Sequence, residues 1–125
     1  MIIHSDVSRH VIGAFFDAYK GVGFGYSESI CRNALAVELQ GRGLRIAREV
    51  PLEVVHRGVP MGTFRLDLIV EERVIVEVKA TKGLNDADRR QIQNYLKACP
   101  IEVGLLLNFG PTPERERFLY TNDRK

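Results

Sequence analysis

The spacing of hydrophobic residues in the first third of the chain predicts two helices. Apolar residues recur three or four positions apart between residues 7 and 19, which is the spacing of one helix face. The glycine-rich segment 21 to 25 then interrupts this pattern and ends the first helix. Ser27 can cap a second helix over residues 28 to 40, whose apolar residues again share one face. The chain therefore begins with two helices joined by a glycine turn.

The hydrophobic period then changes to two, which predicts strands. Apolar and polar residues alternate around Pro51, which indicates an edge strand that ends in a turn near residues 58 to 62. Two further runs rich in β-branched residues, 64 to 70 and 73 to 80, are separated only by Glu71 and Glu72. Because this is the spacing of a hairpin, we expect the two strands to pair in antiparallel fashion.

The last third of the chain predicts a helix followed by a buried strand. Asp86 can cap a helix that runs to residue 98, and Pro100 separates it from the apolar run 101 to 109. A strand, a helix and a strand in this order form a right-handed crossover with a parallel strand pair. Residues 116 to 120 could add a final short strand. The predicted fold is α/β in the order α-α-β-β-β-α-β, with helices flanking a central mixed sheet of four to five strands.

The composition predicts one folded domain spanning residues 1 to 125, with a core from about residue 5 to about residue 120. The chain is 45% hydrophobic and 27% charged, a globular balance that excludes disordered, collagen-like and coiled-coil proteins. Its longest apolar run is far shorter than the roughly 20 residues of a membrane span, and no secretory signal follows Met1. We therefore expect a cytoplasmic protein with no membrane partner.

Charge and cysteine content narrow the classes of function only slightly. Lys and Arg outnumber Asp and Glu by 18 to 16, and this formal charge of +2 permits a nucleic-acid partner without requiring one. Cys31 and Cys99 lie far apart and have no neighbouring cysteine or histidine with the spacing of a zinc site. We expect both to be reduced core residues, and nothing indicates an organic cofactor.

The predicted hairpin carries three residues that could perform chemistry together. Side chains alternate faces along a strand, so Glu77 and Lys79 share one face while Val78 points to the other face and into packing. Asp67 on the partner strand lies near Glu77 if the register of the hairpin brings the two carboxylates together. Oxygen ligands of this kind suit Mg²⁺, which would lower the pKa of a bound water, and a lysine ammonium could orient that water. The alternative is a solvated strand face with ordinary exposed charges.

In their order along the chain, these residues resemble the PD-(D/E)XK nuclease superfamily. Asp67, followed by Glu77-Val78-Lys79 at the end of a hairpin and then by a helix and a strand, is similar to the core of that superfamily. The resemblance implies a restriction-endonuclease-like core with a metal site and the catalytic residues Glu28, Asp67, Glu77 and Lys79. The metal ligands that it implies are Glu28, Asp67, Glu77 and Val78. The implied cofactor is Mg²⁺ or Mn²⁺.

A second resemblance covers nearly the whole chain. The segments 25 to 35, 94 to 97 and 103 to 110 are similar to the small proteins called GxxExxY, which belong to the same superfamily. One departure is Cys31, which stands where the GxxExxY pattern has a tyrosine. A phenol at this position could hydrogen-bond or stack near the site, and the cysteine removes it.

Glu28 also has an argument of its own. It begins the apolar stripe that continues through Cys31 and Leu35, so its carboxylate is expected to point inward. An inward carboxylate needs a partner. The alternative is an acid in the first turn that complements the helix dipole. The resemblance favours the metal ligand.

Four residues are candidates for contacts with nucleic acid. Gln91 and Tyr95 lie four apart on one helix face and resemble the Gln-x-x-x-Tyr motif of exonuclease-like members of the superfamily, where it helps to hold the nucleic acid. The alternative is a polar flank beside a half-buried tyrosine. Arg65 and Arg90 are candidate phosphate contacts, although exposed basic residues are mostly solvated surface.

The sequence thus predicts a divalent-metal-dependent nuclease that hydrolyses nucleic-acid phosphodiester bonds, with DNA or RNA left open. The alternative is a degenerate nuclease fold that binds nucleic acid or a protein without cutting, because the charge is modest and the surface small. A homodimer would enlarge that surface. A purely structural domain would show neither metal binding nor affinity for nucleic acid.

Overall fold

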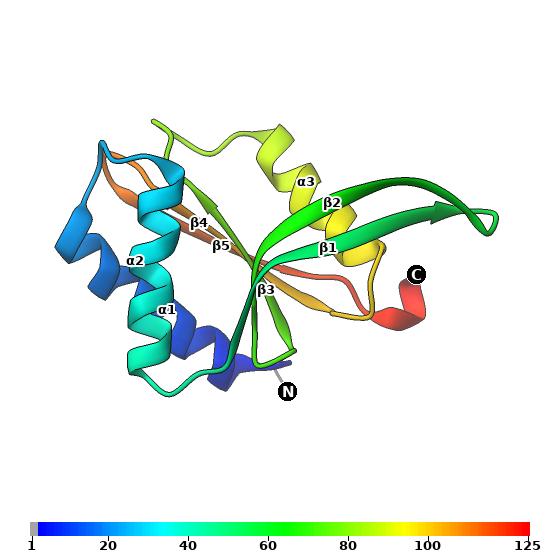
Figure 1. Ribbon diagram of the computed structural model, residues 1–125, viewed down its shortest axis with the longest axis horizontal. Coiled ribbons are helices and arrows are strands. Elements are labelled where there is room, and N and C mark those ends of the chain that lie inside the picture. Colours follow the sequence, from blue (N-terminus) through cyan, green and yellow to red (C-terminus); the bar gives the residue numbers. More distant parts are fainter. Residues whose placement is uncertain (1–2) are drawn as a thin grey trace.

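The computed structural model describes residues 3–125, and these fold into three α-helices, five strands and a terminal 3₁₀ turn (Figure 1). The helices are α1 (Ser5–Val22), α2 (Glu28–Gly41) and α3 (Asp86–Lys97). The strands are β1 (Ile46–His56), β2 (Val59–Val70), β3 (Val74–Lys79), β4 (Val103–Phe109) and β5 (Pro113–Leu119), and the turn is Asn122–Arg124. The predicted α/β class and its order of elements are confirmed, with a fifth strand that begins at Pro113 rather than at residue 116.

The five strands form one mixed sheet in the order β1-β2-β3-β4-β5. β3 and β4 pair in parallel, and the other neighbouring strands pair antiparallel. This arrangement confirms the predicted hairpin of β2 and β3 and the parallel pair on either side of α3. It also confirms the edge position of the strand that contains Pro51.

Helices cover both faces of the sheet and divide the core in two (Figure 1). α1 and α2 pack on one face, over the larger core, which includes Val78. α3 packs on the other face, over a smaller core that includes Ile75 and Tyr95. Because side chains alternate along β3, Glu77 and Lys79 share the face of Ile75 and lie toward α3.

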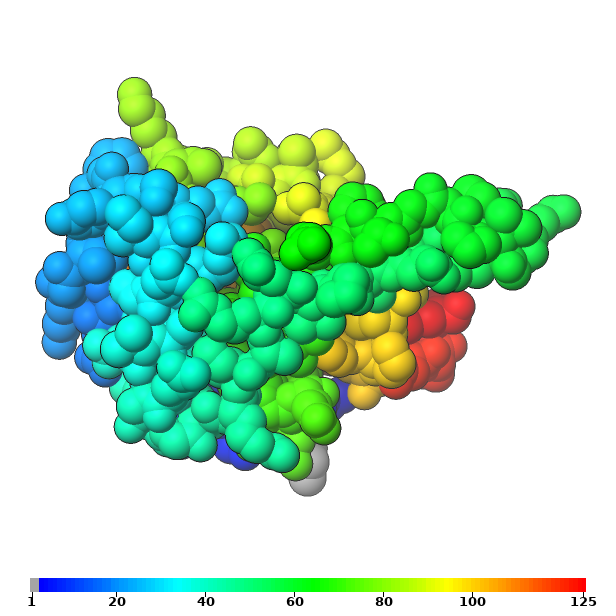
Figure 2. Space-filling model, in the orientation of Figure 1, coloured from blue at the N-terminus to red at the C-terminus, as the bar shows by residue number. Residues whose placement is uncertain are grey.

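β1 and β2 form a long hairpin that projects beyond the rest of the molecule (Figures 1 and 2). Its tip is a two-residue turn at Arg57 and Gly58, whose φ values of 52° and 76° are those of the type I′ turn that closes tight hairpins. The turn predicted over residues 58 to 62 is therefore wrong in its extent, and β2 already begins at Val59. Residues 59 to 65 are all exposed, so no alternation of buried and exposed positions marks them as a strand.

The hairpin is irregular where Glu49 faces Asp67. β1 and β2 pair on both sides of these two residues but not at them, and Glu49 has a left-handed φ of 51°. The pairing of β2 with β3 also ends at Leu68. Leu66 accordingly packs in the smaller core and Leu68 in the larger one, although regular alternation would place both on one face. Asp67 is therefore paired in neither ladder, and its side chain is free to turn toward β3.

Glu49 is a position where glycine is expected to stabilise the fold. A left-handed φ costs a residue with a side chain about 1–2 kcal/mol, so Glu49→Gly should raise the free energy of unfolding by up to about 1 kcal/mol. Glu53→Gly is the matched control, because Glu53 is an exposed glutamate of the same strand in regular pairing with Thr63. The control should lower the free energy of unfolding by about 0.5–1 kcal/mol. Urea unfolding compares the two, and effects of the same sign would contradict the expected strain at Glu49.

Candidate active site

Asp67 and Glu77 meet where β2 leaves β3, and each side chain contacts the backbone of the other strand. The N–H of Asp67 donates a hydrogen bond of 3.1 Å to Oε1 of Glu77. The N–H of Val78 donates one of 2.8 Å to Oδ2 of Asp67. These bonds continue the connection between the strands after regular pairing ends at Leu68. The two carboxylates therefore lie side by side, as the sequence predicted for a suitable hairpin register.

Glu77 is buried, with only 4% of its surface exposed. Its pKa is raised from 4.5 to about 8, first by burial and then by the charge of Asp67, against the opposing effects of the Asp67 N–H and the Lys79 ammonium. Without a further cation, Glu77 is therefore mostly protonated at neutral pH. A buried carboxyl beside a second carboxylate is typical of functional sites.

Lys79 is held between the end of β3 and α3. Its Nζ donates a hydrogen bond of 3.0 Å to Oε1 of Gln91 and lies 4.0 Å from Oδ1 of Asp88. Both partners belong to α3, so the ammonium group is fixed on the face of the sheet that carries Glu77. Gln91, which the sequence predicted as a nucleic-acid contact, orients the lysine in this structure.

Arg32 enters this cluster from α2, and sequence reasoning missed it. Its Nη1 donates a hydrogen bond of 3.0 Å to Oδ1 of Asp67, and both side chains are mostly buried. The one signal in the sequence is spacing, because Arg32 follows Glu28 by four residues and so lies on the same helix face. Asp67 therefore already has a cationic partner.

Glu28 lies in the first turn of α2 and is exposed, so the expectation that it points into the core is wrong. The buried stripe of α2 begins only at Cys31. Part of its carboxyl is nevertheless shielded: burial raises the pKa of Glu28, the Lys79 charge lowers it, and the Asp67 charge raises it. Glu28 therefore lies at the rim of the group of charged side chains that includes Asp67, Lys79 and Arg32.

This cluster holds more negative than positive charge. Its members are the carboxylates of Glu28, Asp67, Glu77 and Asp88 and the cations of Arg32 and Lys79. Four carboxylates against two cations give a net charge of about −2 when every group is ionised. Within residues 3–125, no three acidic, histidine or cysteine side chains converge on one point as metal ligands. A pair of carboxylates with excess negative charge fits Mg²⁺, which keeps waters and binds through one or two carboxylates together with substrate oxygens.

The remaining predicted nucleic-acid contacts lie on β2, which carries Arg65, and on α3, which carries Arg90 and Tyr95. Tyr95 on α3 is buried, and its ring centroid lies 5.3 Å from that of Phe64. Burial raises the pKa of Tyr95 to about 12, and the charges of the two paired carboxylates act in the same direction, so its phenol stays protonated. Arg65 and Arg90 are exposed, and neither forms an ion pair with another residue in the range 3–125.

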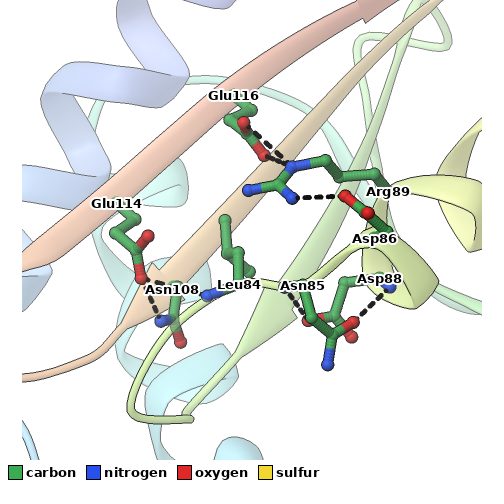
Figure 3. A network of polar contacts seen from close by, with 8 residues as sticks. All are labelled: Leu84, Asn85, Asp86, Asp88, Arg89, Asn108, Glu114 and Glu116. Atoms are coloured by element: carbon green, nitrogen blue, oxygen red, sulfur yellow. Dashed lines mark hydrogen bonds and ion pairs between the residues drawn. The ribbon is translucent and has the colours of Figure 1, made fainter.

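A polar network anchors the loop that follows Lys79 (Figure 3). Asn108 on β4 is fully buried, and its Oδ1 accepts a hydrogen bond from the N–H of Thr81. Its Nδ2 donates to the carbonyl of Thr81 and to Oε1 of Glu114. The Glu114 carboxylate also accepts from the N–H of Leu84. Both polar atoms of the Asn108 amide therefore have hydrogen-bond partners, and the loop is anchored at Thr81 and at Leu84.

The first turn of α3 is fixed by a capping box. The side chain of Asn85 accepts from the N–H of Asp88 at 2.9 Å, and the carboxylate of Asp88 accepts from the N–H of Asn85 at 3.1 Å. The predicted cap Asp86 is therefore wrong by one residue, because Asn85 is the residue with extended backbone before the helix. Arg89 in the next turn pairs with Asp86 and with Glu116 on β5 (Figure 3). The helix end that contacts Lys79 is thus tied to the sheet.

Gly110 is needed beside this network, and its replacement should be costly. A Cβ at this position would lie 2.8 Å from the carbonyl oxygen of Thr81 and 2.9 Å from Nδ2 of Asn108. Gly110→Ala should therefore lower the free energy of unfolding by about 1–3 kcal/mol. Gly83→Ala is the control, because the nearest atom to its Cβ would be 4.0 Å away, and it should change stability by less than about 0.5 kcal/mol. Thermal unfolding measures the stability of both variants. Equal Tm values for Gly110→Ala and Gly83→Ala would show that the structure accommodates a Cβ at position 110 without loss of stability.

Cys31 belongs to the larger core and is fully buried. Burial and then the charge of Glu28 raise the pKa of its thiol, which disfavours the reactive thiolate. Both cysteines are free, but Cys99 is only partly buried against the smaller core, so the prediction of a core residue is confirmed for Cys31 alone. The residue that departs from the GxxExxY pattern therefore packs in the core, and a phenol in its place would also have to be accommodated there.

The sheet, its flanking helices and the Asp-Glu-Lys cluster at the central hairpin define a restriction-endonuclease-like α/β fold. A family model described as the PD-(D/E)XK nuclease superfamily matches residues 5–118. The chain belongs to this superfamily, and the resemblance found in the sequence is confirmed at this level. The GxxExxY assignment, the single-domain organisation and the homodimer stay predictions.

A solved structure described as "Crystal structure of SSO0001" is similar in fold, with a TM-score of 0.62 and 21% sequence identity. The match covers 74% of this chain and 50% of the other, so this chain spans about half the length of that structure. At this identity the likeness establishes the fold alone. No curated protein matches the chain. Among residues 3–125, no helix is both long and apolar enough to cross a membrane.

Proposed function

We propose that this protein hydrolyses phosphodiester bonds of nucleic acids with the help of a divalent metal ion, Mg²⁺ or Mn²⁺. The observation that carries the proposal is the buried Glu77 beside Asp67, with Lys79 fixed on the same face of the sheet. Membership of the PD-(D/E)XK nuclease superfamily supports the same class of reaction.

The residues of the cluster suit such an ion by their chemistry. Asp67, Glu77 and the backbone carbonyl of Val78 would hold it, and Glu28 would contribute from the rim. When bound, the ion would lower the pKa of a water molecule and neutralise charge on the phosphate. Glu77 is ready for this role only after it loses its proton, because its pKa is about 8 in the absence of a further cation.

The other side chains act on the water and the phosphate. Lys79 uses one N–H to bind Gln91, and its remaining donors can hydrogen-bond the attacking water or a phosphate oxygen on which charge develops. Arg32 holds Asp67 in place through one N–H and has further donors for a phosphate. Arg65 and Arg90 are exposed and can contact phosphates farther along the strand.

A cleavage panel tests the proposal. Single-stranded and double-stranded DNA and RNA are incubated with Mg²⁺ or Mn²⁺, and the wild-type protein should cut at least one of them. Asp67→Asn should not cut, because the amide lacks the charge that holds a cation. Asp17→Asn is the control, because Asp17 pairs with Arg42 on the surface and should be dispensable. Cutting that persists in Asp67→Asn, or a wild-type protein that cuts nothing, would contradict the proposal.

One observation favours a second function, in which the protein binds nucleic acid without cutting it. Arg32 already pairs with Asp67, and within residues 3–125 no three acidic, histidine or cysteine side chains lie close enough together to ligate one ion. In that case the affinity would depend on salt and would survive Glu77→Gln. Calorimetric titration with Mn²⁺ separates the two functions, because only a metal site in the cluster gives binding that Glu77→Gln removes.

A further inference from the structure

A groove of about 480 Å³ lies between the β1–β2 hairpin and α3. The hairpin contributes Val55, His56 and Phe64, and the helix contributes Asn94, Tyr95 and Lys97. Figure 1 shows the hairpin running alongside α3, and in Figure 2 its green strands stand beside the yellow surface of that helix. Tyr95 lines the groove and is also close enough to the paired carboxylates for their charges to affect its pKa. Tyr95 follows Gln91, the hydrogen-bond partner of Lys79, by one turn of α3, so the groove adjoins the candidate active site.

The wall of this groove next to Tyr95 is an exposed aromatic ring. Phe64 is 47% exposed, and its ring packs against Tyr95 at a centroid distance of 5.3 Å and an interplanar angle of 58°. Tyr95 is buried and so supports Phe64 from one side while part of the phenylalanine ring stays open. A supported, open ring of this kind is a stacking surface for another flat group.

The polar and charged side chains that line the groove are of the kinds that bind nucleotides. Its lining contains no carboxylate, but it contains the cation of Lys97, the imidazole of His56 and the amide of Asn94. Lys97 is exposed and forms no ion pair within the described part of the chain. A cation suits a phosphate, and an amide can both donate to and accept from the edge of a base. An aromatic wall beside a cation thus matches a nucleotide better than a purely apolar ligand.

We propose that this groove binds one unpaired base of a single-stranded nucleic acid, stacked on Phe64, with an adjoining phosphate at Lys97. This inference rests on the proposed function. Phe64 and Asp67 lie three positions apart on β2, so a base stacked on Phe64 would lie beside the site that would cut the strand. Bases inside a duplex are stacked on one another and cannot offer a face to Phe64. The groove therefore selects single strands over duplexes.

Fluorescence anisotropy with a labelled oligothymidylate of about 12 nucleotides tests the groove. Ca²⁺ replaces Mg²⁺ and Mn²⁺ in the buffer so that the strand is not cut. Phe64→Ala should weaken binding about tenfold, since stacking on an aromatic ring contributes that much per base, whereas Phe64→Tyr should bind as the wild type does. Val37→Ala is the control, because Val37 is 66% exposed on α2 and does not line the groove.

An abasic strand of the same length separates stacking from charge. Wild type and Phe64→Ala should bind this strand equally, because it has no base to stack. Lys97→Met should weaken the binding of both strands, because it removes a phosphate contact. Thermal unfolding of Phe64→Ala and Lys97→Met shows whether each variant is folded.

The outcomes distinguish the groove from the proposed function. An unchanged affinity of Phe64→Ala, an equal loss for the abasic strand, or tighter binding of a duplex of the same sequence would overturn the base-binding groove. None of these outcomes would contradict the proposed function, because cleavage by the wild type is measured separately in the cleavage panel. A wild-type protein that binds no strand and cuts none would overturn both.

Discussion

Lys79→Met is expected to slow phosphodiester cleavage by at least about 100-fold while the protein remains folded. Methionine keeps the apolar stem of the side chain but lacks the ammonium group that donates to Gln91. That group is held on the face of the sheet that carries Glu77, where it can act on charge that develops during the reaction. The loss should therefore appear in kcat more than in KM.

Lys82→Met is the matched control for this variant. It removes the same charge three residues farther along, from an exposed side chain in the loop after β3. Initial rates on whichever nucleic acid the wild type cuts best should be nearly unchanged for Lys82→Met. If Lys79→Met cut as fast as this control, the lysine would have no part in the reaction.

The metal-free protein should lose stability as the pH rises from 4.5 to about 8. Glu77 has an ordinary pKa of 4.5 in the unfolded chain and a pKa of about 8 in the folded protein, so the folded state binds its proton more tightly throughout this window. The stabilisation is complete below pH 4.5 and is lost as the pH rises through about 8. At about 1.4 kcal/mol per pKa unit, the expected loss in the free energy of unfolding is on the order of 5 kcal/mol.

Glu77→Gln isolates this effect, because its amide has a similar shape and does not titrate. Urea unfolding in EDTA at the two ends of the pH window should show a much smaller change for Glu77→Gln than for the wild type. Mn²⁺ should reverse the trend in the wild type, because a cation binds the ionised carboxylate more tightly as the pH rises. Parallel pH profiles of the two proteins would show that Glu77 titrates normally.

The parts of the fold that could be predicted from sequence are those in which burial imposes a period. β4 is buried along its whole length and β3 nearly so, and both appear in the sequence as apolar runs bounded by polar turns. The first part of β2, residues 59 to 63, could not be predicted, because these residues are all exposed and carry no such period. There the backbone pairing with β1, rather than burial, makes the strand.

The candidate site likewise contains residues that the local sequence pattern could place and residues that it could not. Local alternation was enough to place Glu77 and Lys79 on one face. The position of Asp67 beside Glu77 depends on the hairpin register, which the sequence left open. Arg32 could not be placed, because its contact with Asp67 joins residues 35 positions apart and depends on how α2 lies against β2. The role of Asn108 was hidden for the same reason, since its contacts with Thr81 span 27 positions.

The irregular point at Glu49 and Asp67 divides the sheet into two parts with unequal support. On one side, β3 and β4 are buried between helices, whereas on the other side the outer hairpin is largely solvated. Solvated elements of this kind open locally at a lower free energy than the core. Asp67 lies at the boundary and Phe64 lies beyond it. The proposed catalytic residues therefore lie on or next to the buried strands, whereas the proposed base-binding surface lies on the more easily opened hairpin. Local opening of the outer hairpin would therefore remove the surface around Phe64 while the three helices and the buried strands stay folded.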